Sequence, residues 1–221
     1  MLDQLVETAL RDNRDLRLAA ARVDQFMLAE LAGDRELGYY GVALRLAEGL
    51  VFFSLILQST LYPVLVQAHK ASKAEFQAKL MSFYRASFVL ALLVCVPVAL
   101  LGPWLVQLLF GPAYEAAGPL LSLMAGRVML AFMGIARSVF LLIEDLQAWA
   151  TLTLAVGTAL NVALNVLWIP EHRGVGAVWA SLVSFAVTSF VVDLFNRRTR
   201  GNVADIGRAM ATCWRLKEAL R

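Results

Sequence analysis

Five long apolar stretches, separated by short polar breaks, fill most of the chain after Gly38. They cover residues 42–68, 85–110, 118–143, 146–169 and 174–195. Each reaches the ~20 residues that a helix needs to cross ~30 Å of hydrocarbon. A membrane strand would need only ~10 residues and would alternate polar with apolar side chains, which these stretches do not do. The pattern therefore predicts an all-α, polytopic membrane helix bundle with five transmembrane helices.

Composition supports the membrane prediction. Hydrophobic residues make up 60% of the chain and charged residues 17%, and the mean hydropathy is +0.67. An ordinary soluble domain is about half apolar and about a quarter charged. A soluble domain of 221 residues is therefore the weaker interpretation.

Basic residues predict the orientation in the membrane. The break between the first two stretches is basic, and so is the region after residue 196. Both should be cytoplasmic, because Lys and Arg are enriched in cytoplasmic loops. The basic side chains are His69, Lys70, Lys73, Lys79 and Arg85 in the break, and Arg197, Arg198, Arg200, Arg208, Arg215, Lys217 and Arg221 in the tail. We expect a transmembrane bundle over residues 33–196 and a cytoplasmic tail over residues 197–221.

Residues 1–32 are less apolar and form a third predicted region. Apolar side chains recur at helical spacing over residues 2–10, opposite charged ones, which predicts an amphipathic helix. Further along, Arg22, Asp24 and Glu30 would each cost ~2.5 to 3.5 kcal/mol at mid-bilayer, so unaided spanning is unfavourable. The helix can lie on the membrane surface, pack on a partner, or have no role of its own.

Catalytic and cofactor motifs are absent from the sequence. It contains no HExxH, CxxC, P-loop or GxSxG pattern. The basic tail is explained by topology and lacks the aromatic context of nucleic-acid binding. We therefore expect no enzyme, no cofactor, no metal site and no nucleic-acid partner.

Ionisable residues inside the stretches are the main candidates for function, because such residues usually face a polar cavity or a partner. Arg45 and Glu48 can pair at i, i+3 near the outer end of the first stretch, in a structural or a substrate-binding role. Arg127 lies nine residues into its stretch, ~13 Å deep, with no acidic residue within one turn. Arg137 lies near the inner interface, where it can face a cavity or extend toward the headgroups.

A cavity lined by Arg45, Arg127 and Arg137 would be cationic and suited to an anionic substrate such as a diphosphate. Asn161 and Asn165 form an i, i+4 pair within the fourth stretch. They can serve helix packing through hydrogen bonds or contact a substrate, and packing is the commoner role.

Several short motifs, in order over about residues 22–200, resemble the C-terminal half of bacterial polysaccharide and O-antigen flippases. These proteins belong to the multidrug, oligosaccharidyl-lipid and polysaccharide exporter superfamily. The motifs are Arg22-Val23-Asp24-Gln25-Phe26-Met27-Leu28, Gly38-Tyr39-Tyr40, Ala43, Arg45-Leu46, Pro63, Trp104-Leu105, Phe110-Gly111, Tyr114, Ala117, Asn161, Leu164-Asn165, Ile169-Pro170, Gly176-Ala177 and Ala180-Ser181.

The resemblance implies one lobe of a two-lobe flippase of the bacterial inner membrane. Such a protein exports an undecaprenyl-diphosphate-linked oligosaccharide by alternating access, often coupled to a cation gradient. It also implies that Asp24 lies in the first helix of the lobe and Arg45 in the second, both as cavity residues. The expected partners are the anionic lipid-linked oligosaccharide and an N-terminal flippase lobe, or a second copy of the chain.

The sequence departs from this family in three ways. It supplies one lobe, and its first helix is not strongly apolar. The family usually has glycine three residues after Pro170, where this chain has Arg173. Residues 1–25 resemble instead the N-terminus of an outer-membrane efflux protein, by chance or through a gene fusion.

Three functions remain open from the sequence. The favoured one is half of a lipid-linked oligosaccharide flippase. The second is a non-transporting remnant that acts at most as a scaffold or partner subunit. The third is a multidrug-type cation exporter, which is disfavoured because the stretches offer only Glu48 and Asp193 as carboxylates, near their ends.

Overall fold

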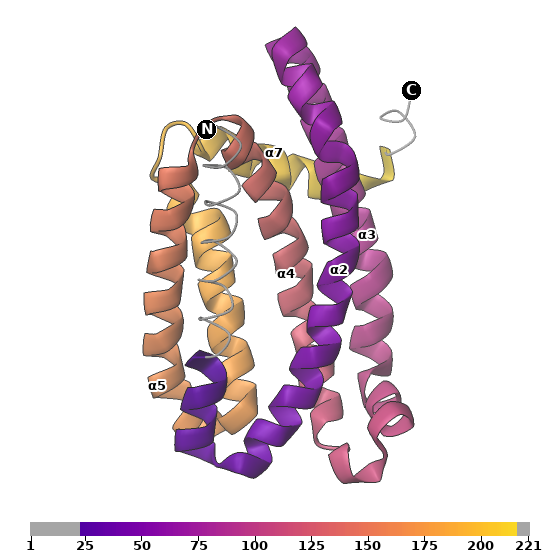
Figure 1. The fold of residues 1–221 in the computed structure, drawn as a ribbon, viewed down its shortest axis with the longest axis vertical. Helices are drawn as coiled ribbons and strands as arrows, with labels where there is room; N and C mark the ends of the chain where they lie inside the picture. Colours follow the sequence, from indigo (N-terminus) through magenta and orange to yellow (C-terminus); the bar gives the residue numbers. More distant parts are fainter. Residues whose placement is uncertain (1–22, 216–221) are drawn as a thin grey trace, which may run out of the picture.

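The computed structural model describes residues 23–215, and Figure 1 shows this part of the chain as a bundle of long helices. Residues 23–32 are helical and end at Gly33, whose φ of 88° favours glycine. The following helix, α2, spans Asp34–Ala71. The amphipathic helix predicted over residues 2–10 lies outside the described residues.

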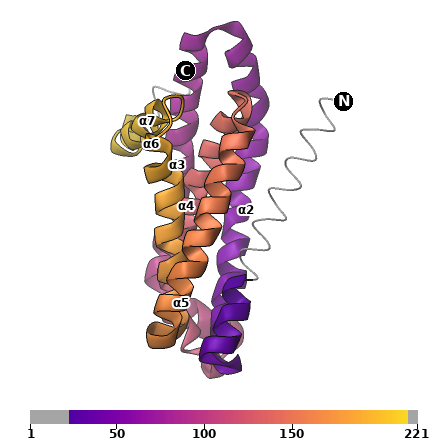
Figure 2. The ribbon, with the colours of Figure 1, turned by 90° about the vertical axis from the view of Figure 1, so that its left-hand side faces the viewer.

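α2 and α3 form a long hairpin. α3 spans Lys73–Phe110, and each helix has 38 residues, which at 1.5 Å per residue is ~57 Å against ~30 Å of hydrocarbon. Only Ser72 separates them, and its Oγ accepts a hydrogen bond of 3.1 Å from the backbone N–H of Glu75, capping α3. Figures 1 and 2 show the tip of this hairpin extending beyond the other helices.

The polar break between the first two apolar stretches, residues 69–84, is helical. α2 and α3 continue through it, except at Ser72. The segment contains three Ala and three Lys, which have high helix propensity, so its polarity does not end the helices.

α3 ends at Gly111, with φ 78°, and a 3-10 turn over Pro112–Tyr114 leads to α4 at Ala117–Ile143. α4 packs against both α2 and α3. The core between these helices consists of buried apolar side chains, among them Leu44, Phe83, Leu121, Met124 and Phe132.

α5, at Gln147–Ala186, folds back on itself at Arg173, whose φ of 50° and ψ of −131° break the helix. Its two arms are antiparallel, since Asn161 Nδ2 donates to Ser181 Oγ at 3.4 Å. A π-helical turn at Val187–Val191 and the short α6 at Val192–Leu194 extend the second arm.

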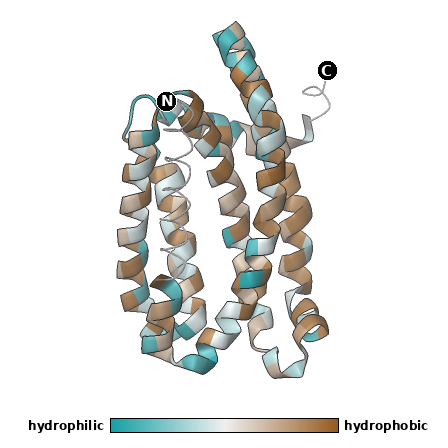
Figure 3. Ribbon diagram, viewed as in Figure 1, coloured by the Kyte–Doolittle hydropathy of each residue, from teal (hydrophilic) through white to brown (hydrophobic). Residues whose placement is uncertain are grey.

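Four helical runs of the described chain are long and apolar enough to cross a membrane: α2, α3, α4 and the run Gln147–Leu194. Figure 3 shows mainly hydrophobic colours along the middle of α3. The expected count of five separate spans is not matched. The stretches predicted at 146–169 and 174–195 correspond to the two arms of the fourth run, on either side of the turn at Arg173.

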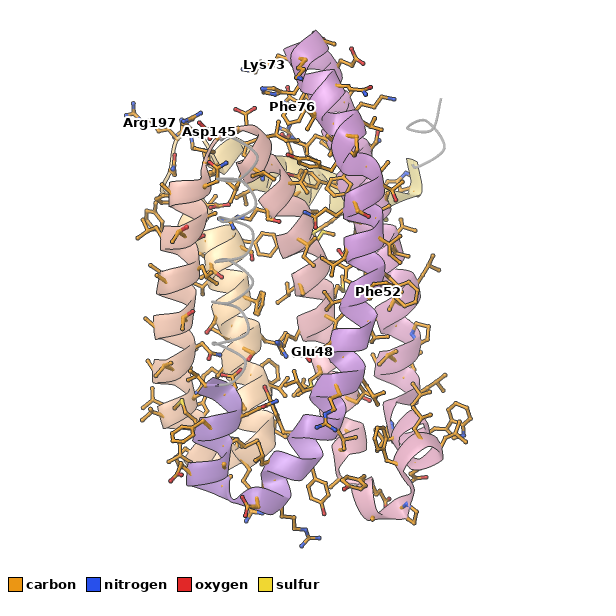
Figure 4. All side chains as sticks on the ribbon, in the orientation of Figure 1. Glu48, Phe52, Lys73, Phe76, Asp145 and Arg197 are labelled. Atoms are coloured by element: carbon orange, nitrogen blue, oxygen red, sulfur yellow. The ribbon has the colours of Figure 1, made fainter. Side chains whose placement is uncertain are left out.

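Three connections that the topology predicts on one side of the membrane do lie at one end of the molecule. Figure 4 shows Lys73 at the tip of the α2–α3 hairpin, Asp145 between α4 and α5, and Arg197 after α6, all at that end. This arrangement agrees with the predicted alternation of the spans.

The tail carries a further helix, α7 at Arg200–Ala211, followed by a 3-10 turn at Cys213–Arg215. α7 lies crosswise to the long helices and packs against α3 (Figure 1). Tyr84 Oη donates to Asn202 Oδ1 at 2.6 Å, and Arg85 Nε donates to Thr212 Oγ1 at 3.2 Å. The first half of the predicted tail is therefore fixed to the bundle.

A buried ion pair joins α4 to the second arm of the α5 run. Arg137 is 7% exposed, and its Nε and Nη2 donate to the two carboxylate oxygens of Asp193 at 2.5 and 2.6 Å. Trp149 Nε1 donates to the same carboxylate at 2.8 Å, and Arg137 Nη2 also donates to Thr153 Oγ1 at 3.3 Å. Arg137 therefore does not extend toward the headgroups, because Asp193 neutralises it inside the bundle.

We predict that Arg173→Gly raises the stability of the protein. Arg173 adopts a positive φ that costs a residue with a side chain ~1 to 3 kcal/mol. The contact that would be lost, Arg173 Nη1 to Glu36 Oε1 at 3.4 Å, is exposed and contributes little. Thermal unfolding in nanodiscs should show a higher Tm, whereas the control Arg45→Gly, within α2, should lower it. A lower Tm for Arg173→Gly would contradict the strained turn.

Removing one member of the Arg137–Asp193 pair should destabilise the protein strongly. Asp193→Leu leaves the Arg137 charge buried without its partner, which costs ~3 to 5 kcal/mol. The double variant Arg137→Leu/Asp193→Leu should recover most of this loss in the same unfolding assay. Equal Tm values for the single variant and the wild type would show that the pair is not buried as described.

Candidate functional site

Asp24 is the centre of a buried polar cluster. Asp24 belongs to the short helix at residues 23–32 and is only 4% exposed. Asn165 Nδ2 donates to Asp24 Oδ1 at 2.6 Å, and Ser181 Oγ donates to Oδ2 at 3.0 Å. Tyr40 Oη donates to Oδ2 at 3.5 Å. The cluster thus joins this helix to α2 and to both arms of α5.

Asn161 extends the cluster by one helical turn. Its Oδ1 accepts a hydrogen bond of 3.1 Å from Asn165 Nδ2, as the i, i+4 spacing allows. Its Nδ2 reaches Ser181, so the two asparagines and the serine hold the arms of α5 together. Asn165 Oδ1 is buried and has no hydrogen-bond partner among the described residues. An unpaired buried acceptor beside a carboxylate is costly unless a ligand satisfies it.

Arg127 lies near this cluster without joining it. It is partly exposed on α4, and its guanidinium carbon is 5.9 Å from the centre of the Phe185 ring, a cation–π contact. Its charge is close enough to attract the Asp24 carboxylate. No salt bridge joins it to any residue in the described range. Its cationic group thus remains available for an anion.

Arg45 and Glu48 are exposed on α2, where Figure 4 labels Glu48. The predicted Arg45–Glu48 pair is wrong, since no salt bridge joins these two described side chains. An exposed i, i+3 pair gains too little to hold two long side chains together. They share one side of α2 with Gly38, Gly49 and Phe52, which we call the open face of α2. Added side-chain carbons at the two glycines would meet nothing within 4 Å.

The structure brings together Asp24, Asn161 and Asn165 of the predicted substrate-binding residues, with Arg127 nearby. Arg45 and Glu48 lie apart on the open face, and Arg137 is occupied by Asp193. Their substrate-binding roles stay predictions.

Sequence reasoning missed Tyr40 and Ser181 as members of the site. Both were present only as parts of the family resemblance. A usable signal existed at Asp24: a charged residue that is costly in a membrane needs hydroxyl or amide partners, and Tyr40 and Ser181 both carry hydroxyls. Asp24 does not count among the carboxylates of the apolar stretches, Glu48 and Asp193, because its helix is not apolar enough to be a predicted span.

The cluster offers hard oxygen ligands: a carboxylate, two amide oxygens, a serine hydroxyl and a tyrosine hydroxyl. Oxygen ligands suit small hard cations, whereas softer metals prefer His and Cys. The described residues contain no group of three or more His, Cys, Asp and Glu side chains that could hold a metal ion. With a single formal negative charge, the cluster fits a monovalent cation or a proton, and Arg127 fits an anionic group.

Comparisons with known proteins give one match. Residues 15–119 match a family model described as "Polysaccharide biosynthesis protein". No curated protein and no solved structure shows significant similarity to the chain. The matched range holds Asp24, Tyr40 and the open face of α2, while Arg127 and the α5 arms lie beyond it. Over residues 15–119, the chain is similar to the polysaccharide biosynthesis protein family.

Proposed function

We propose that the chain forms one lobe of a membrane flippase for polysaccharide biosynthesis. The substrate is an undecaprenyl-diphosphate-linked oligosaccharide, and the membrane is the bacterial inner membrane with the C-terminus in the cytoplasm. The second lobe is an N-terminal flippase lobe from another chain, or a second copy of this one, placed against the open face of α2. The chain carries out transport and no covalent chemistry.

The observation that carries this proposal is the guanidinium of Arg127. It lies ten residues into α4, ~15 Å from its start, inside a helix apolar enough to span a membrane. An arginine at this depth is costly and is usually retained for a substrate path or a partner. A diphosphate offers oxygens in the fork geometry that a guanidinium binds best.

Two further observations support it. The match to a polysaccharide biosynthesis family fits a sugar-linked cargo. The open face of α2 adds Arg45 to a surface whose glycines leave room for close approach. A lobe packed there would enclose Arg45 and face Arg127 toward a shared path.

The Asp24 cluster supplies the coupling-ion site in this proposal. A cation bound between Asp24 and the α5 amides would satisfy the buried acceptor Asn165 Oδ1. Because the cluster joins the first helix, α2 and both arms of α5, occupancy would change how these helices pack. Alternating access needs such a difference between the bound and free states.

Arg127→Ala should reduce polysaccharide export by at least tenfold, since one charge-assisted contact to a phosphate contributes ~1.5 to 3 kcal/mol. Surface polysaccharide is measured in a strain that depends on this protein. Arg127→Lys should retain part of the activity because it keeps the charge. Full export by Arg127→Ala, at normal protein level, would contradict the assignment.

Asp24→Asn should abolish the dependence of export on a cation gradient, because the cluster loses its negative charge and its affinity for a cation. The measurement compares flipping in proteoliposomes with and without an imposed Na⁺ or proton gradient. Asn161→Asp, which adds a carboxylate one turn away, is the matched control and should retain cation binding. If flipping by the Asp24→Asn variant still depended on the gradient, the assignment of the ion site to this cluster would be wrong.

A multidrug-type cation exporter is the second candidate, and the buried carboxylate of Asp24 favours it. The two candidates differ in their cargo. Cells that express the exporter should expel a cationic dye and lose this ability with Asp24→Asn. If expression of the protein did not change dye accumulation, while loss of the protein abolished polysaccharide export, the exporter would be excluded and the flippase would remain.

A further inference from the structure

α7 packs against α3 next to Tyr84, just before the apolar stretch that begins at residue 85. In Figure 2 it is seen nearly end-on at the flank of the bundle, beside α6 and α3. The buried side chains of Asn202, Ile206 and Ala209 face the bundle, and the Tyr84–Asn202 hydrogen bond fixes this position. A helix held crosswise at this level lies in the headgroup region of a bilayer.

Large apolar side chains stand exposed at both ends of α7. Phe195, just before it, is 82% exposed, and Leu194 is 54% exposed. Trp214, just after it, is 74% exposed. Aromatic residues at this depth are typical membrane anchors, because an interface accepts their apolar rings and their polar edges together.

Positive charge accompanies these apolar side chains. Residues 194–214 contain four arginines and one acidic residue, Asp205. Arg208 Nη1 pairs with Asp205 at 3.3 Å, and Arg198 Nη2 donates to the carbonyl of Glu144 at 3.1 Å. Arg197 and Arg200 are exposed and make no side-chain hydrogen bond within the described chain. Their charges are therefore free to bind anions.

We propose that residues 194–214 form a binding surface for the anionic phospholipids of the cytoplasmic leaflet. The exposed aromatic rings at the two ends of α7 enter the headgroup layer, and Arg197 and Arg200 bind phosphate groups beside them. Clusters of basic residues directly after a membrane span attract anionic lipid in this way. The free arginines complement the negative charge of anionic lipid. The exposed aromatic side chains at both ends of α7 favour a lipid surface over a protein partner, because a protein partner would not require membrane anchors.

Neither the predicted topology nor the proposed transport function accounts for this binding surface. The positive-inside rule accounts for the presence of arginines but not for exposed Phe195 and Trp214 on either side of a fixed interfacial helix. The inference does not depend on whether the chain moves a lipid-linked sugar, so transport and lipid binding can fail separately.

The test reconstitutes the full chain in nanodiscs of phosphatidylcholine, alone or mixed with phosphatidylglycerol. The environment of Trp214 is obtained by subtracting the fluorescence of the Trp214→Phe variant, and its depth from quenching by brominated phospholipid. We expect stronger quenching and a blue shift in the phosphatidylglycerol discs. High salt should weaken both effects, because it screens exposed charges.

Variants separate specific binding from general charge. Arg197→Gln/Arg200→Gln should lower quenching in phosphatidylglycerol discs to the level found with phosphatidylcholine. Lys70→Gln/Lys73→Gln removes the same charge from the hairpin tip and should leave quenching unchanged. Equal quenching in both lipids, unaffected by the arginine variant, would overturn the proposed recognition of anionic lipid. No quenching in either lipid would show that Trp214 faces water or protein.

Discussion

A carboxylate enclosed by apolar helices needs hydrogen bonds from its neighbours, and the packing of this bundle depends on the hydrogen bonds that Asp24 receives. Burial removes the hydrogen bonds that water would give this carboxylate, and an isolated buried charge costs several kcal/mol or more. Tyr40, Asn165 and Ser181 supply its hydrogen bonds from three different helical segments. The short helix at residues 23–32, too polar to span alone, is therefore held against α2 and α5 through its most polar residue.

Two buried ionic groups in this bundle have opposite characters. Asp193 accepts three side-chain hydrogen bonds and is neutralised by Arg137, which makes the pair a structural connection between α4 and α5. Asp24 has only neutral donors, with Arg127 at a distance and Asn165 Oδ1 unpaired. A saturated pair resists change, whereas an incompletely satisfied cluster can respond to an ion. This contrast is why we propose Asp24, and not Asp193, as the coupling-ion site.

Much of the fold followed from the sequence, because membrane helices are determined by length and hydropathy. The apolar stretches at 118–143 and at the two arms of α5 agree closely with the helices. Hydropathy alone does not show that α2 and α3 continue into the polar tip of their hairpin, because helix propensity there does not depend on hydrophobicity. Arg173 shows a different limit: the family resemblance places glycine at this turn, and only backbone angles reveal that the arginine adopts the conformation that glycine prefers.

The sequence predicted several individual residues of the site, but it did not predict that they lie together. Asp24, Asn161 and Asn165 were recognised singly, but they meet only because α5 folds back and the first helix lies against it, and no local pattern encodes that. The partner of Arg137 could not be read from a local pattern either, since Asp193 lies 56 residues further along the chain.

The central claim is that this bundle binds a diphosphate-linked lipid through Arg127. Native mass spectrometry of the protein released from nanodiscs tests it most directly, with undecaprenyl diphosphate and uncharged undecaprenol added in equal amounts. Preferential retention of the diphosphate by the wild-type protein, and its loss in Arg127→Ala, is the predicted result. Equal retention of both lipids, or unchanged diphosphate binding in the variant, would contradict the claim.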